Sequence, residues 1–248
     1  MALFNSTNPA LRNNTFTRLE PGASVMTVQG TVNKTGVLLL LCIAAASWTW
    51  HLASVNGVAA MQPWMTGGFL GGFIVALVAI FVKKSTPFTA PIYAVLEGLA
   101  LGGVSSVIDQ AYPGIAIQAV SITFGSLAVM LALYSTGVIR ATPAFVRGVF
   151  IATGAVCCVY LVDLVLGLFG HHVPYINDGG SIGILVSLVV VVIAALNLVI
   201  DFAVIEQGAR EGAPKYMEWY GAFGLMVTLV WLYLEILRLL AKVRGGRD

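Results

Sequence analysis

The sequence contains few charged residues. Of its 248 residues only 10% are Asp, Glu, Lys or Arg, whereas 58% are hydrophobic and the mean hydropathy is +0.92. Soluble domains carry roughly 25% charged residues, because a surface that faces water needs them. A chain this poor in charge must turn most of its outer surface toward something other than water, which excludes an ordinary soluble domain.

Cysteines and catalytic motifs are scarce as well. The three cysteines, Cys42, Cys157 and Cys158, lie inside apolar runs, so we interpret them as packing residues and not as a disulfide framework. The sequence has no metalloprotease, serine hydrolase or phosphate-loop motif and no basic stripe for nucleic acid. We therefore expect a protein that is not an enzyme, with no cofactor, no metal site and no nucleic-acid partner.

Long apolar stretches are what the sequence does contain. A helix needs about 20 mostly apolar residues to cross a bilayer, and its backbone groups must be bonded internally, which requires a helix. Seven stretches meet this requirement, and the sequence therefore predicts an all-α membrane protein with seven transmembrane helices. The stretches are 36–55, 64–82, 88–108, 114–134, 145–169, 182–203 and 219–241.

The remaining segments are short and polar. Residues 1–35 are rich in Asn and Thr and lack an apolar period, which is typical of a flexible N-terminal tail. Residues 36–241 are predicted to form the seven-helix transmembrane domain, and residues 242–248 a short basic C-terminal tail. The first apolar stretch starts too late and runs too long for a signal peptide.

Basic residues in the short loops indicate the orientation, because cytoplasmic loops carry an excess of Lys and Arg. Here they gather before the first helix and in the loops after the second, fourth and sixth helices. They are Arg12, Arg18, Lys34, Lys83, Lys84, Arg140, Arg147, Arg210 and Lys215. We expect a multi-pass protein of the plasma (inner) membrane whose N-terminus is cytoplasmic.

The basic C-terminal end disagrees with this pattern. Seven crossings place the C-terminus outside, yet Arg238, Lys242, Arg244 and Arg247 lie there. Either the last segment crosses fully against its charge, or it is re-entrant and returns to the inner side. Its length favours a full crossing.

Four acidic residues stand inside apolar stretches. An ionised carboxylate at mid-bilayer costs at least about 2.5–3.5 kcal/mol, so each acid should face the bundle interior and have a partner. At 1.5 Å per residue, Glu97 and Asp201 lie at a similar depth, roughly 10–13 Å from the inner boundary. Asp163 and Glu235 fall in the outer half, where we expect secondary acids and a partly solvated ion pair of Glu235 with Arg238. The alternative for each is a structural acid, protonated or hydrogen-bonded.

The inner acids suggest a mechanism. Two carboxyls close together in a low-dielectric bundle do not easily both ionise, so they tend to share a proton. Glu97 and Asp201 would then attract a cation at higher pH and be protonated at lower pH. Glycines cluster on the second and third stretches, where they allow close helix packing; a hinge is the alternative. They are Gly67, Gly68, Gly71, Gly72, Gly98, Gly102 and Gly103.

Two groups of segments resemble the Bax inhibitor-1/YccA-like family over roughly residues 30–240. They are 93–102 (YAVLEGLALG), and 198–202 (LVIDF) with 205–206 and 216–219 (YMEW). The resemblance implies seven helices, six of them surrounding a central seventh. Members resemble pH-sensitive calcium-leak channels, and animal relatives are associated with protection from cell death.

The family's sensor is a pair of aspartates on the sixth and seventh helices, sometimes latched by a basic residue on the second. Asp201 matches the first aspartate, but no acid lies between residues 219 and 234, where Met226 stands near the expected depth. The second stretch has no basic residue before Lys83. We infer that Glu97 takes the place of the missing partner, and we include Glu206 in the predicted ion pathway.

These features predict a pH-sensitive cation (calcium-type) leak channel gated by buried carboxylates, with calcium or protons as the ion and the lipid bilayer as its surroundings. The alternative is a non-transporting membrane interaction protein that regulates membrane proteases or stress and cell-death partners. Neutralising Glu97 and Asp201 distinguishes the two, because only the channel depends on these acids.

Overall fold

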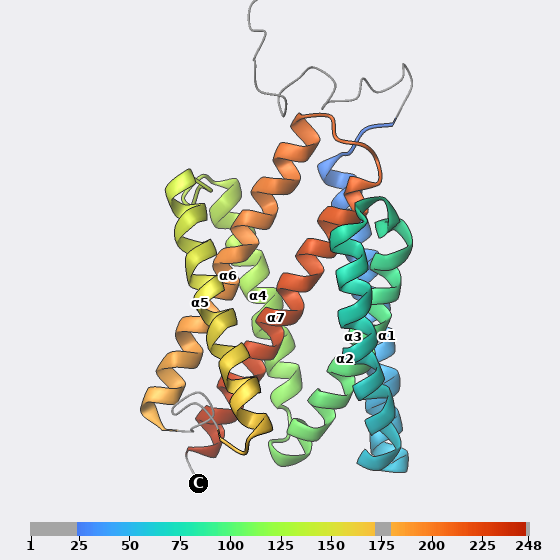
Figure 1. Cartoon of the computed structure of the whole chain (residues 1–248), viewed down its shortest axis with the longest axis vertical. Coiled ribbons are helices and arrows are strands. Elements are labelled where there is room, and N and C mark those ends of the chain that lie inside the picture. Colours follow the sequence, from blue (N-terminus) through green and yellow to red (C-terminus); the bar gives the residue numbers. More distant parts are fainter. Residues whose placement is uncertain (1–23, 172–179, 247–248) are drawn as a thin grey trace, which may run out of the picture.

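The computed structural model describes residues 24–171 and 180–246, and helices dominate this part of the chain (Figure 1). All seven long helices have the length and composition needed to cross a membrane, which confirms the predicted all-α fold with seven spans. A 3-10 turn, η2 (Lys83–Ser85), joins α2 to α3. The helices are α1 (Val28–Asn56), α2 (Val58–Phe81), α3 (Thr86–Ala111), α4 (Ile115–Ser135), α5 (Pro143–Leu168), α6 (Ser181–Arg210) and α7 (Met217–Gly245).

The first helix begins earlier than the sequence predicted. Thr27 has extended backbone, and its hydroxyl accepts a hydrogen bond from the Gly30 N–H, which makes it the N-cap of α1. The helix therefore includes residues 28–35, which the sequence assigned to a flexible tail because they are polar. The rest of that predicted tail, residues 1–23, lies outside the described residues. At the other end, α7 continues to Gly245, past the predicted boundary at 241.

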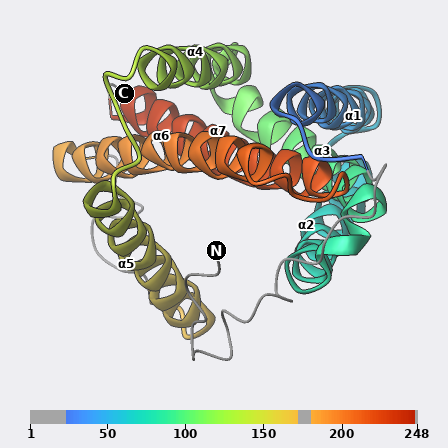
Figure 2. The ribbon, with the colours of Figure 1, turned by 90° about the horizontal axis from the view of Figure 1, so that it is seen from above.

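Helix α7 is the most buried of the seven helices. It lies beside α6 and also packs against α1, α3 and α4, while α1, α2 and α3 gather on one side of the α6–α7 pair (Figure 2). Helix α2 packs against α1 and α3, and α5 packs against α6. The implied ring of six helices around α7 is therefore not confirmed, because four of them form its immediate shell.

The cysteines differ from one another in their surroundings. Cys42 is buried in the core, as expected for a packing residue. Cys157 and Cys158 are exposed on α5, so the packing interpretation is wrong for these two. The reason is that α5 packs mainly against α6, which leaves most of its surface facing outward.

Glycines allow α1, α2 and α3 to approach closely. A Cβ atom at Gly98 or Gly102 of α3 would overlap backbone carbonyl groups of α1. A Cβ atom at Gly68 of α2 would lie 2.5 Å from the Leu96 carbonyl oxygen of α3. These contacts support the packing interpretation of the glycine clusters, since small residues bring membrane helices together in this way.

We expect Gly102→Ala to lower the free energy of unfolding by about 1–3 kcal/mol, because the added methyl group has no room against α1. The measurement is denaturant unfolding in mixed micelles. Gly125→Ala on α4 is the matched control, because a Cβ there meets nothing within 4 Å. Equal stability of the two variants would contradict the close α1–α3 packing.

Candidate functional site

Asp201 lies in the C-terminal half of α6 and is close to α7. Its Oδ2 atom is buried and has no hydrogen-bond partner among the described residues. The hydroxyl of Thr228, a buried residue of α7, lies close to the carboxyl. An unsatisfied buried oxygen costs about 1–3 kcal/mol and calls for an explanation such as a bound ion or water. Asp201 thus has the chemistry to accept a cation.

Met226, where the resemblance places the second acid, faces a different part of the molecule. It lines a mostly apolar cavity of about 570 Å³ between α1, α3, α4 and α7. Residues two apart on a helix are separated by a rotation of roughly 200°, so their side chains point to nearly opposite sides. Thr228, and not Met226, is therefore an α7 residue close to Asp201. The sequence prediction missed Thr228 because it considered only acids as partners.

Glu97 is buried where α3 packs against α1 and α2. A Cβ at Gly72 of α2 would lie 2.9 Å from its Oε1 atom, so the missing side chain of Gly72 makes room for the carboxyl. Tyr93, one turn earlier on α3, lies close to the carboxyl, and Cys42 of α1 is close enough to interact electrostatically. Glu97 therefore belongs to the α1–α2–α3 packing.

The structure does not bring Glu97 and Asp201 together as the expected pair. The neighbours of Glu97 lie on α1, α2 and α3, whereas the neighbour of Asp201 lies on α7. No hydrogen bond joins the two carboxyls in the described part of the chain, and α3 and α6 each pack against α7 instead of extensively against each other. Residue spacing along each helix predicts depth, but it does not predict the direction in which a side chain points.

Glu206 lies at the end of α6, and its side chain is 38% exposed. Its carboxylate accepts hydrogen bonds from the Tyr134 hydroxyl of α4 and from Arg210, one turn later on α6. Exposed ion pairs contribute about 0–1 kcal/mol. The structure therefore places Glu206 in a surface cluster that joins α4 to α6, away from the α7 face that holds Asp201.

Glu235 is buried near the opposite end of α7. It accepts hydrogen bonds from the Tyr160 hydroxyl of α5 at 2.9 Å and from the Trp231 indole at 3.2 Å, and it pairs with Arg238 at 3.4 Å. The predicted pairing with Arg238 is confirmed, but the carboxyl is only 2% exposed and so is not solvated. Asp163 is half-buried on α5 and also takes part in a polar interaction.

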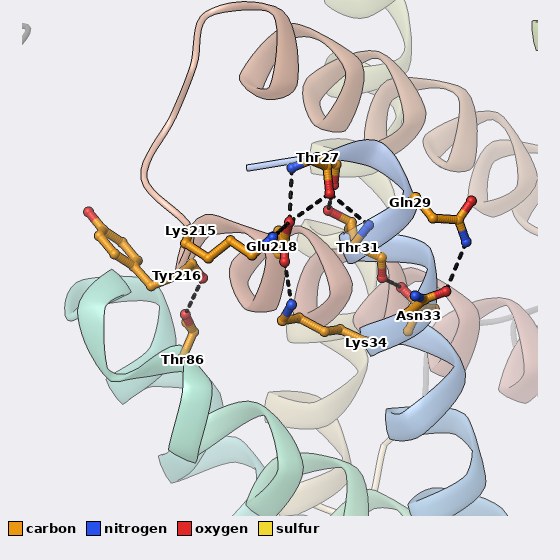
Figure 3. A network of polar contacts seen from close by, with 11 residues as sticks. Thr27, Gln29, Thr31, Asn33, Lys34, Thr86, Lys215, Tyr216 and Glu218 are labelled. Atoms are coloured by element: carbon orange, nitrogen blue, oxygen red, sulfur yellow. Dashed lines mark hydrogen bonds and ion pairs between the residues drawn. The ribbon is translucent and has the colours of Figure 1, made fainter. Parts of the chain in front are cut away.

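Another buried acid, Glu218, lies in the first turn of α7 and is 0% exposed (Figure 3). Its carboxylate accepts hydrogen bonds from the Thr27 N–H at 2.9 Å and the Thr27 hydroxyl at 2.8 Å. It also pairs with Lys215 at 2.8 Å and with Lys34 of α1. The sequence prediction noted Glu218 only within the 216–219 segment. An acid in the first helical turn next to lysines was the signal available.

Seven apolar helices that enclose buried carboxyls define an integral, multi-pass α-helical membrane protein. Residues 8–245 match the family described as Bax inhibitor 1 like, and the chain belongs to this family, as the resemblance predicted. Comparison with curated proteins and with solved structures found no match.

We expect Tyr160 and Glu235 to show a coupling energy of about 0.6 kcal/mol, and at most about 1.7 kcal/mol, as hydrogen bonds between membrane helices do. The measurement is a double-mutant cycle of Tyr160→Phe and Glu235→Met by unfolding in mixed micelles. Tyr134→Phe, whose hydroxyl bonds Glu206 instead, is the control and should be additive with Glu235→Met. A coupling of zero for Tyr160 would show that α5 is not tied to α7 by this bond.

Proposed function

We propose that this protein is a pH-sensitive cation leak channel of the calcium type, in the plasma (inner) membrane with a cytoplasmic N-terminus. The observation that carries the proposal is the buried Oδ2 atom of Asp201, which has no hydrogen-bond partner in the described residues. A desolvated carboxylate oxygen without a hydrogen bond is costly when the group is ionised. Its site therefore favours either a proton or a cation, and competition between the two makes cation binding depend on pH.

The ligand chemistry supports a hard cation. Calcium prefers oxygen ligands, including carboxylates and carbonyls. Asp201 supplies a carboxylate from α6, and Thr228 supplies a hydroxyl oxygen from α7. The resemblance to the Bax inhibitor-1/YccA-like family implies one aspartate on the sixth helix and one on the seventh. This chain therefore has one ionisable group where the family has two. Asp201 alone then acts as the titrating group of the site.

Glu97 has a separate place in the proposal. Because its neighbours lie on α1, α2 and α3, it is a second buried carboxyl and not the partner of Asp201. We assign the gating role to Asp201, and we place Glu97 on the ion path at a distinct position. Glu206 has no part in the gate in this proposal, because its carboxylate is paired with Arg210 at the surface.

Calcium flux into proteoliposomes between pH 6 and pH 8 tests the proposal. Asp201 must lose its proton to attract a cation, so the leak of the wild type should rise with pH. Asp201→Asn should abolish this dependence, while Glu97→Gln should lower the rate but keep its pH dependence. Glu211→Gln is the control, because Glu211 is exposed and its carboxylate accepts a hydrogen bond from Gln207.

Two results would overturn the channel proposal. One is a pH dependence in Asp201→Asn equal to that of the wild type. The other is the absence of any leak from all four proteins, which favours the alternative, a non-transporting protein that regulates membrane proteases or stress and cell-death partners. Wild-type activity in that role would then survive neutralisation of both buried acids.

A further inference from the structure

Residues 25–27 cross over the connection between α6 and α7. The Met26 N–H donates a hydrogen bond to the Ala213 carbonyl at 2.7 Å, and Val25 forms an antiparallel bridge with Pro214. The Met26 side chain is only 4% exposed and packs near Gly208 of α6. The segment is therefore held by backbone bonds and by a buried anchor. We call residues 25–27 the strap.

Glu218 joins the strap to two helices at once. Its carboxylate accepts two hydrogen bonds from Thr27 of the strap and pairs with Lys34 of α1. It also pairs with Lys215 of the α6–α7 connection (Figure 3). Hydrogen bonds to an ionised group are roughly twice as strong as those between neutral groups. A fully buried carboxylate with four donor contacts is therefore a strong attachment for the start of α7.

The fit at this attachment is tight. Gly30, in the first turn of α1, faces the Glu218 carboxylate so closely that a Cβ atom there would overlap it. Gly221, one turn after Glu218, also has no room to spare, since a Cβ would lie 3.1 Å from Thr31 of α1 and 3.1 Å from Ile205 of α6. The start of α7 is thus held against both α1 and α6.

We propose that the strap, Lys34 and Glu218 form a clasp that sets the position of α7 and thereby keeps Thr228 against Asp201. Glu218 and Thr228 lie on the same helix, roughly 15 Å apart along its axis at 1.5 Å per residue. A helix transmits a shift of one end as a rigid element. Releasing the clasp therefore separates the two sides of the ion site and raises the leak. Glu218 is a positioning residue in this scheme, which rests on the proposed function.

A disulfide across the strap tests the clasp directly. Residues facing each other in an antiparallel bridge have Cα atoms about 4.5–5.5 Å apart, within the range of a disulfide. Val25→Cys with Pro214→Cys, in a background with Cys157→Ala and Cys158→Ala, locks the strap when oxidised. We expect the oxidised protein to leak more slowly than the same protein after reduction, and addition of reductant should restore the faster rate.

Two substitutions are expected to weaken the clasp, one on α7 and one on α1. Glu218→Gln removes the charge that pairs with the lysines, and Gly30→Ala places a methyl group where the carboxylate lies. Each should slow cross-linking between the two introduced thiols by about tenfold, the order of one hydrogen bond to a charged group, and should raise the leak. The matched controls are Glu211→Gln and Gly36→Ala, since a Cβ at Gly36 meets nothing within 4 Å.

The readouts separate the two proposals. Cross-linking reports the position of the strap whether or not the protein conducts ions. If cross-linking slows in Glu218→Gln and Gly30→Ala but no protein leaks calcium, the proposed channel fails and the clasp loses its gating role. If the wild type leaks and neither oxidation nor the two substitutions change the rate, the clasp inference is overturned and the channel stands. A change in both readouts, absent from the controls, supports the clasp.

Discussion

The structure depends on one constraint, which is that polar groups buried along α7 must be matched by groups from other helices. Hydrocarbon offers no hydrogen-bond partner, so each unmatched group would cost on the order of several kcal/mol. The matches involve α1, α3, α5 and α6, and they are distributed from one end of α7 to the other. They are Glu218 with Thr27 and Lys34, Thr228 with Asp201, Tyr233 with Ser105 at 2.6 Å, Glu235 with Tyr160, and Lys242 with Ser187 at 2.8 Å. Apolar packing alone would let α7 rotate or slide, whereas these matches select one position.

This distribution couples distant parts of α7. Because the helix is a rigid element, a displacement at Glu218 also disturbs the contacts at Thr228 and at Glu235. A shift of α7 would therefore break several of these contacts at once. Packed interfaces of this kind favour a few discrete arrangements over continuous movement. The pair at Asp201 is the least complete of these matches, because Oδ2 remains without a hydrogen bond in the described residues. The other buried side-chain atom of this kind in the described residues is Oγ of Ser106 on α3.

The number and nature of the helices were predictable from the sequence, because apolar length and the need for internal backbone bonds leave no other fold. The residue types of the site were also visible, since acids such as Asp201 and Glu235 stand out in apolar stretches. The pairing of Glu235 with Arg238, one turn later on the same helix, was predicted as well. Partners on other helices were not, because a residue's depth follows from its position in the helix but its direction follows from packing. Glu97 turns toward Gly72, and the polar residues after 28 join α1 because Thr27 caps it, although composition alone assigned them to a tail.

The replacement of a second acid by Thr228 changes what the proposed site can do. Two neighbouring carboxyls titrate as a coupled pair and can present two negative charges to a divalent cation. A carboxyl beside a hydroxyl releases one proton and presents one charge, so it neutralises half the charge of a calcium ion. Because calcium affinity is tuned by the charge of its ligands, a site of this kind holds the ion weakly and lets it leave readily. Weak binding suits a leak, since conduction requires an ion to enter a site without being retained there. The chain's departure from the two-aspartate pattern is therefore compatible with the proposed cation passage, in which one proton on Asp201 takes the place of a shared proton and the proposed clasp adds control through the position of α7.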